Sequence, residues 1–451
     1  MHFYQRGQLG QIPQITIYDV FMSIRKTLKC KPVKKQNGWK IITVSGTAKE
    51  RGFQHGSALS QELAKLVEVF SYDLQCNEIS LEDYLNLCNK LARPYFDKRK
   101  CCAEWKEELE GMVEGALSKG VIITVDFLFG WNMYLGMDPF FTNIIKKSDH
   151  CSAFIATGDA TKDGKIVMAH NTHCDFIWAN FSNIVQCVKP AKGHPFVMQT
   201  APGLLCSSTD WFLSRSGIIG CETTIADTTY TPNFGKPYFC RIRECMQYAE
   251  SLDDCVRMMR EDNAGDYPCG WMFGDTNTGE IMLLEVAKTV AEPRRTKSGV
   301  FYGTNFAHDS DIRDNQTENN FEIHNLSTSI GSRNVRLEWL LNKVYWGRLD
   351  SSNAKKVIAD HFDPYKCRNR KGCRSICKHT ELESEKTNRP AKYPFGAIDG
   401  KVVDSSMAKK LAFWGRWGSS CGRAFHLTKS RKKTHPYVPD LKSEPWTRVN
   451  A

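Results

Sequence analysis

The sequence predicts an α+β fold in which a helical region precedes a domain built mainly of strands. Between about residues 50 and 140, apolar residues recur at spacings of three and four, most regularly in Ala58–Leu74, Leu81–Tyr95 and Trp105–Leu117. From Cys151 onward, apolar and polar residues alternate over about 160 residues, which is typical of strands. The strands come in runs with a few intervening and trailing helices, and this order favours a layered α+β domain over a doubly wound sheet.

The change of period at His150–Cys151 predicts a boundary within the chain. Residues 1–150 are expected to form a helical N-terminal region, and residues 151–451 the main domain with a C-terminal helical and loop extension. The main domain is expected to begin with a hairpin, Ser152–Thr157 paired with Lys165–Asn171, whose turn ends in Asp163-Gly164. Cys151 would then lie at the tip of a strand.

Further strands and helices are predicted along the main domain. Strands are expected at Asn183–Val188, Phe196–Thr200, Gly217–Ile225, Trp271–Asp275, Glu280–Ala287 and Val300–Asn305. Helices are expected at Arg241–Arg260, Val335–Trp346 and Ser352–His361.

The composition indicates an ordinary globular protein with a positive field. The 451 residues are 41% hydrophobic and 25% charged, and the formal net charge is +11. This charge allows peripheral contact with an anionic membrane. The densest basic runs, Lys98–Lys100 and Lys429–Lys433, carry no aromatic-interleaved nucleic-acid motif, so they are interpreted as solvated surface and no nucleic-acid partner is expected.

The cellular compartment is predicted from targeting signals and cysteines. Neither a secretory signal nor an apolar run of the roughly 18 residues that a membrane-spanning helix needs is visible, which favours a cytoplasmic protein. The 18 cysteines, together with glycosylation tripeptides at Asn180, Asn315 and Asn325, leave a lysosomal or secreted location as the alternative.

Cys151 is the first candidate nucleophile, because it opens a strand where the organisation of the chain changes. A cysteine in such a place can also be a small buried hydrophobic residue. The surrounding sequence has to decide between these two interpretations.

Several motifs resemble, in their order, those of one enzyme family. They are GTAKERGFQHG from Gly46, CSAF from Cys151, AHNT from Ala169, SSTDWFLSRSGIIGCETTI, NAGDYPCGWMFGDTNTGEIMLLE, CRSICKH and PFGAIDGKVVDSSMAKK. Over roughly residues 40 to 440 the chain resembles the phospholipase B-like and acyltransferase-type group of cysteine N-terminal-nucleophile (Ntn) hydrolases. The resemblance implies a four-layer αββα Ntn-hydrolase sandwich made as a precursor, which cleaves its own His150–Cys151 bond and leaves residues 1–150 as a propeptide or a retained chain.

Cleavage would give Cys151 a free α-amino group, which has a pKa of about 7.7 to 8.0 and can accept the thiol proton near neutral pH. The resemblance also implies site residues. His170 and Asn171 would orient the thiol and substrate. The oxyanion hole would be formed by Thr223, through its backbone or side chain, and by the side-chain amide of Asn305. Arg336, or else Arg333, would lie near the nucleophile. Asp175 could hydrogen-bond the new amino group, position His170, or be a turn residue. His170 and His173 stand where bile-acid-hydrolase-like relatives have an arginine and an aspartate, which favours the phospholipase B-like branch.

No cofactor or metal is expected. Phosphate-binding glycine loops, the H-E-x-x-H motif and the G-x-S-x-G elbow are all missing. Cys367, Cys373, Cys377 and His379 are potential zinc ligands, but only Cys373 and Cys377 form a tight pair, and a disulfide or a surface loop is the preferred interpretation.

The predicted function is hydrolysis of an acyl ester or amide through a thioester acyl-enzyme on Cys151, with an acylated small molecule or phospholipid as substrate. The alternatives are an acyltransferase or amidase acting on an N-acyl small molecule, and a non-catalytic lipid-binding protein of the same fold. After cleavage, the N-terminal fragment is expected to stay associated.

Overall fold

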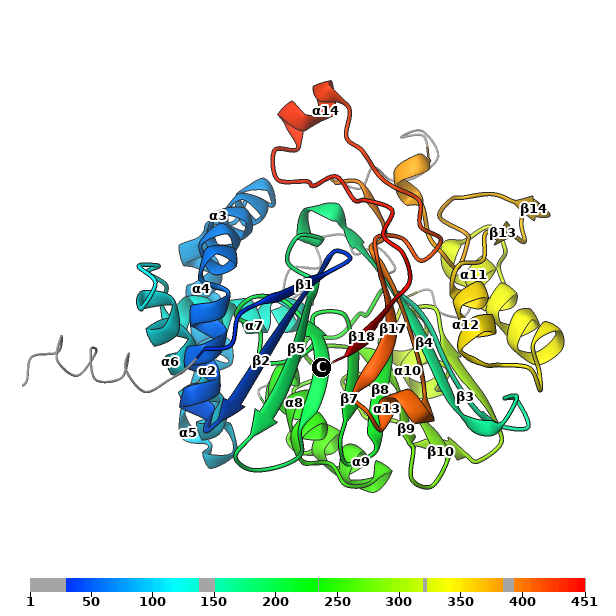
Figure 1. Ribbon diagram of the computed structural model, residues 1–451, viewed down its shortest axis with the longest axis horizontal. Coiled ribbons are helices and arrows are strands. Elements are labelled where there is room, and N and C mark those ends of the chain that lie inside the picture. The colour runs from blue at the N-terminus through cyan, green and yellow to red at the C-terminus, as the bar shows by residue number, and fades with distance from the viewer. Residues whose placement is uncertain (1–29, 138–150, 234, 319–322, 384–392, 451) are drawn as a thin grey trace, which may run out of the picture.

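Two large β-sheets form the centre of the computed structural model, which describes residues 30–137, 151–233, 235–318, 323–383 and 393–450 (Figure 1). The nine-stranded sheet has the order β1-β2-β5-β6-β7-β8-β9-β10-β11. Its strands are β1 (Lys34–Gln36), β2 (Trp39–Gly46), β5 (Ile184–Pro190), β6 (Phe196–Thr200), β7 (Trp211–Ser214), β8 (Ile218–Thr224), β9 (Cys269–Asp275), β10 (Glu280–Val286) and β11 (Arg294–Thr296).

The seven-stranded sheet has the order β12-β3-β4-β16-β17-β18, and β15 pairs with the end of β4. Its strands are β3 (Cys151–Gly158), β4 (Gly164–Asp175), β12 (Gly299–Gly303), β15 (Phe395–Ala397), β16 (Asp399–Asp404), β17 (Ala412–Trp417) and β18 (Thr447–Asn450). Two short strands, β13 (Phe362–Asp363) and β14 (Arg368–Asn369), pair with each other. The predicted hairpin is therefore present as β3 and β4.

The helices before the gap at 138–150 are α2 (Ala48–Ala58), α3 (Ser60–Cys76), α4 (Leu81–Leu91), α5 (Arg93–Lys98), α6 (Ala103–Leu117) and α7 (Val125–Met137). Those after it are α8 (Tyr238–Tyr248), α9 (Leu252–Arg260), α10 (Ser310–Gln316), α11 (Ser329–Trp339), α12 (Ser351–Ile358), α13 (Ser405–Ala408) and α14 (Lys429–Thr434). In Figure 1, α2 to α6 lie to the left of the sheets and α11 and α12 lie to the right, whereas α14 lies at the top.

The alternating side chains of β3 define the layers. Ala153 and Ile155 pack into the large core between the sheets, whereas Phe154 and Ala156 join a second core with Leu337 and other residues of the α11 and α12 region. The layers of the fold therefore follow in the order helices, sheet, sheet, helices. The predicted α+β class is confirmed.

The N-terminal region contributes to the sheet as well as to the helical layer. β2 lies parallel to β5 in the register Lys40 with Ile184 to Gly46 with Pro190. Helix α2 begins in a capping box, in which the Thr47 side chain accepts from the Glu50 N–H and the Glu50 carboxylate accepts from the Thr47 N–H. Segments within residues 30–137 are therefore built into the same core as the main domain.

The single helix predicted at Arg241–Arg260 is wrong, because two helices occupy this segment. Ala249 is extended, and the Ser251 side chain accepts a hydrogen bond from the backbone N–H of Asp254, so it starts α9 as an N-cap. None of the described helices is both long and apolar enough to span a membrane.

Candidate active site

Cys151 is the first residue of β3 and lies between β12 and β4. It is opposite Thr172 in the β3–β4 register, and only 2% of its surface is exposed. Its backbone nitrogen donates a hydrogen bond to Asn305 Oδ1 over 3.1 Å. His150, the other residue of the predicted cleavage bond, lies outside the described residues.

Asn305 follows β12 in a left-handed backbone conformation with φ of 79°. This conformation is uncommon for a residue with a side chain, and asparagine tolerates it better than most. Its Oδ1 accepts from Cys151 and from Arg333 Nη2 (3.0 Å), and its Nδ2 donates to the carbonyl oxygen of Thr224 (2.9 Å). Asn305 was predicted as an oxyanion donor, but its contact with Cys151 is made by the side-chain oxygen, which holds the backbone nitrogen.

The arginine beside the nucleophile is Arg333 rather than the preferred Arg336. Arg333 Nη1 donates to the carbonyl oxygen of Cys151 over 2.6 Å and to Ser152 Oγ over 3.0 Å. Arg336 lies three residues further along α11 and forms a two-point ion pair with Asp360, with distances of 2.9 and 2.7 Å. The preference for Arg336 was wrong because the sequence does not show which side of helix α11 faces β3.

A cavity of about 160 Å³ adjoins Cys151. Its wall is mainly apolar and aromatic, with Trp131, Tyr134, Leu135, Trp178, Phe181 and Leu204. Its polar lining comes from Asn132, Thr172, His173, Asp175, Ser182, Ser208, Asp210, Thr224, Tyr238 and Tyr267. Small-molecule sites are commonly apolar hollows with a few polar groups, so this cavity is the candidate substrate site.

His173 and Asp175 were predicted as possible site residues, and both line this cavity. Thr223 does not. It lies on β8 beside Gly303, whereas the next residue, Thr224, lines the cavity and contacts the Tyr267 hydroxyl over 2.8 Å. Because successive residues of a strand face opposite sides, the Thr223 side chain points away from the cavity that Thr224 lines. A role for the Thr223 backbone, which the prediction also allowed, stays a prediction.

His170 and Asn171 are buried but are not among the residues that line the cavity. His170 Nε2 contacts the carbonyl oxygen of Glu222 over 3.1 Å. Burial lowers the pKa of His170 well below its ordinary value, and the Lys401 ammonium lowers it further, so the ring is neutral. Asn171 Nδ2 donates to the carbonyl oxygens of Ile358 (2.8 Å) and Ile376 (3.2 Å). Neither side chain is therefore placed to receive the thiol proton.

A buried acidic pair near the cavity was missed in the sequence. Burial raises the pKa of Glu222 well above its ordinary value, and neighbouring Asp210 raises it further; burial also raises the pKa of Asp210. The Tyr267 hydroxyl, which has one hydrogen to donate, lies 2.9 Å from a carboxyl oxygen of Glu222 and 3.4 Å from one of Asp210. Two adjacent buried carboxyls do not both ionise readily, so we expect them to share a proton at neutral pH. Nothing in the spacing of Asp210 and Glu222 along the chain marks them as neighbours.

The same surroundings keep the thiol of Cys151 protonated. Burial raises its pKa well above the ordinary value, Glu222 and Asp210 raise it further, and a backbone hydrogen bond from His173 acts in the opposite direction. A nucleophilic thiolate at this position therefore requires a base close to the sulfur.

No known family model matches the chain. An uncharacterized protein from Archaeoglobus fulgidus is 28% identical over 259 residues, which cover 53% of this chain and 42% of that protein. A putative phospholipase B-like 3 from Caenorhabditis elegans is 28% identical over 137 residues, which cover 28% of this chain and 23% of that protein. In both cases, the matched segment spans less than half of the relative's length.

Two solved structures of altered forms of a conjugated bile acid hydrolase from Clostridium perfringens also match. They have TM-scores of 0.34 and sequence identities of 10% and 8%, and each match covers 59% of this chain and 89% of the other. The chain is thus an α+β protein of two sheets that is distantly similar in sequence to a phospholipase B-like protein.

Proposed function

We propose that this chain is a self-processing cysteine Ntn hydrolase that cleaves an acyl ester or amide, with Cys151 as nucleophile. One observation carries the proposal. The backbone nitrogen of Cys151 is held by Asn305 Oδ1 at 3.1 Å, beside a cavity that the same cysteine lines. Once the preceding peptide bond is broken, this nitrogen is a primary amine on the same acceptor, next to its own thiol.

The amine supplies the base that the buried thiol needs. With a pKa of about 7.7 to 8.0 in an ordinary chain, it accepts the thiol proton, and the sulfur attacks the acyl carbonyl carbon. A carbon–sulfur bond forms, the bond to the leaving oxygen or nitrogen breaks, and the leaving group takes the proton from the ammonium. Water then attacks the thioester, gives a proton to the amine and releases the acid, and the sulfur regains the proton.

Arg333 and Asn305 position the nucleophile in this scheme. The Arg333 guanidinium donates to the Cys151 carbonyl oxygen and to Asn305 Oδ1, so it fixes the backbone on one side and the amine acceptor on the other. Asn305 Nδ2 carries two hydrogens, of which Thr224 accepts one. The second is the candidate donor to the oxyanion.

The cavity favours an acyl chain as the bound group. Aromatic side chains such as Trp131, Trp178 and Phe181 offer an apolar wall, and the hydroxyls of Tyr238 and Tyr267 mark a polar part. The similarity to a putative phospholipase B-like protein supports an ester of an acylated lipid as the first substrate to test. Transfer of the acyl group to an amine instead of water uses the same thioester.

The fragment before Cys151 would stay bound after cleavage. It supplies β2, which pairs with β5, and Glu108 of α6, whose carboxylate accepts from Arg243 Nη2 of α8 over 3.0 Å. Removing it would take away the edge strands β1 and β2, leave β5 as an exposed edge and leave Arg243 without its buried carboxylate.

An activated acyl ester such as p-nitrophenyl octanoate tests this function. The processed protein should release a stoichiometric burst of p-nitrophenol, and the fragment that begins at Cys151 should gain the mass of one acyl group. The rate should rise with pH as the α-amine loses its proton, near pH 8 if its pKa is ordinary. Cys151→Ala should abolish the burst, whereas Cys187→Ala, which removes a buried strand cysteine outside the cavity, should retain it. Stoichiometric binding without a burst would instead support a lipid-binding protein.

A further inference from the structure

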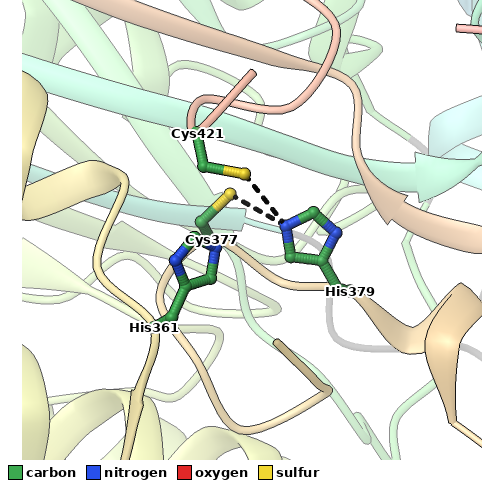
Figure 2. A group of neighbouring side chains, drawn as sticks. All are labelled: His361, Cys377, His379 and Cys421. Atoms are coloured by element: carbon green, nitrogen blue, oxygen red, sulfur yellow. Dashed lines mark hydrogen bonds between the residues drawn. The ribbon is translucent and has the colours of Figure 1, made fainter. Parts of the chain in front are cut away.

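Four side chains outside the candidate active site converge on one point. A nitrogen or sulfur atom of each of His361, Cys377, His379 and Cys421 lies within 4.8 Å of the corresponding atoms of the other three. Figure 2 shows the two sulfur atoms side by side and facing a ring nitrogen of His379, with the His361 ring next to them. The two histidine rings are 5.3 Å apart, centre to centre.

The distances match those of a tetrahedral metal site. Cys377 Sγ and Cys421 Sγ are each 3.4 Å from His379 Nε2. Ligand bonds of about 2.3 Å from zinc to sulfur and about 2.05 Å to nitrogen, at tetrahedral angles, place sulfur and nitrogen ligands about 3.6 Å apart. The side chains need to move only slightly to close around an ion.

One histidine is oriented by a carboxylate. His379 Nδ1 contacts Glu381 Oε1 over 2.7 Å, and both side chains are almost completely buried. Donation of the Nδ1 hydrogen to Glu381 leaves the Nε2 lone pair directed at the two sulfurs, which is the arrangement that commonly orients zinc-bound histidines. The buried Nε2 of His361 makes no hydrogen bond within the described part of the chain.

The surrounding backbone is also held in place. The side chain of Asn171 on β4 donates to the carbonyl oxygens of Ile358 and Ile376 and, over 3.3 Å, to Ser420 Oγ. These three residues precede His361, Cys377 and Cys421 by three, one and one positions. Arg336, through its ion pair with Asp360, fixes the residue before His361. Two residues that were predicted to be catalytic thus organise this cluster.

We infer that His361, Cys377, His379 and Cys421 bind one zinc ion as a closed structural site. Four protein ligands of this type complete the usual coordination of structural zinc and leave no position for substrate. The ion would join three segments that are distant in sequence: the one after α12, the one before Thr380–Leu382 and the one after β17. Asn171 contacts these segments, while the neighbouring Thr172 lines the cavity, so the ion would support β4 from the side away from Cys151. This inference does not depend on the proposed function.

The metal content of the purified full-length chain tests the site. After incubation with zinc sulfate under reducing conditions and desalting, elemental analysis should find about one zinc ion per chain, as a closed structural site requires. Cys421→Ser and His379→Gln should lose this ion. Cys367→Ser, which removes an exposed cysteine of the same region, should retain it.

Cobalt binding gives a second measurement, which does not depend on a variant folding. Wild-type protein loaded with Co²⁺ should show the intense visible bands of tetrahedral cobalt and a near-ultraviolet sulfur-to-cobalt charge-transfer band. Two outcomes would overturn the inference. One is the absence of tightly bound zinc and of these bands. The other is a Cys377–Cys421 disulfide, found by peptide mapping, that persists in protein kept in reducing buffer.

Discussion

Asn305→Gly should slow both the appearance of a new N-terminus at Cys151 and the subsequent acyl turnover by about 10²-fold, the usual cost of misplacing a reacting group. The variant removes the oxygen that holds the Cys151 nitrogen and the amide that donates to Thr224. Glycine accepts the φ of 79° without strain, so the backbone can keep its path and the effect can be assigned to the lost side chain. Processing is followed by intact mass over time, and turnover by p-nitrophenol release.

Asn37→Gly is the matched control for this experiment. Asn37 also has a positive φ, of 44°, but it lies in the turn between β1 and β2 and is not among the residues that line the cavity. The Asn37→Gly variant should cleave itself and hydrolyse the ester at the wild-type rates. If folded Asn305→Gly did so too, the contact between Asn305 and Cys151 would not be needed, and the proposed arrangement of amine and thiol would be wrong.

Glu108→Gln should reduce the free energy of unfolding by about 3 to 5 kcal/mol, the range found when one partner of a buried ion pair is removed. Glu108 Oε2 is 2.7 Å from Arg51 Nη2 and 3.0 Å from Arg243 Nη2, and all three side chains are at most 1% exposed. Glutamine keeps the shape of glutamate but not its charge, so two buried guanidinium groups lose their shared counter-charge. Urea unfolding of the full chain measures the change.

Glu107→Gln, one position earlier on α6 and exposed, should change the same free energy by less than about 0.5 kcal/mol. Because Glu108 joins α2 and α6 to α8, the Glu108 variant should also lose its N-terminal fragment more readily during gel filtration after cleavage. If the free energy of unfolding fell by less than about 1 kcal/mol, other groups would be compensating the charges of both arginines. The expected cost of an unpaired buried charge would then not apply here.

The strands that local patterns could predict were those joined by hairpins or rich in alternating apolar residues. The β3–β4 hairpin and strands β5, β6 and β8 to β10 have such signals. Strand β2 was missed because it precedes a long helical pattern and pairs in parallel with β5, whose paired residues lie 144 positions later, so no turn marks the pairing. The short strands β15 to β18 were missed too, and their pairing depends on contacts across the whole sheet.

Around the nucleophile, the sequence predicted the segments that surround Cys151 but not every side chain that contacts it. Cys151, Asn305 and the alternative Arg333 are brought together, whereas Arg336 faces Asp360. The sequence alone did not show that the Thr224 side chain, and not that of Thr223, lines the cavity, because strand register decides which face of β8 meets it. The roles of all these residues in catalysis remain predictions.

The cysteine–histidine cluster shows a different limit. Spacing led to Cys367, Cys373, Cys377 and His379 as potential ligands, and only Cys377 and His379 belong to the cluster. The other two members, His361 and Cys421, lie 16 residues before and 44 residues after Cys377, too far for any local ligand spacing to indicate them. Only the packing of three segments against β4 brings them together.

Intact mass with N-terminal sequencing of wild type beside Cys151→Ala shows whether Cys151 becomes the N-terminus of the working protein. Wild type should yield a fragment beginning Cys-Ser-Ala-Phe, while Cys151→Ala should stay whole under the same conditions. If wild type also stays whole at neutral pH, in mild acid and after a protease trim, Cys151 is a structural cysteine and the proposed hydrolase mechanism is contradicted.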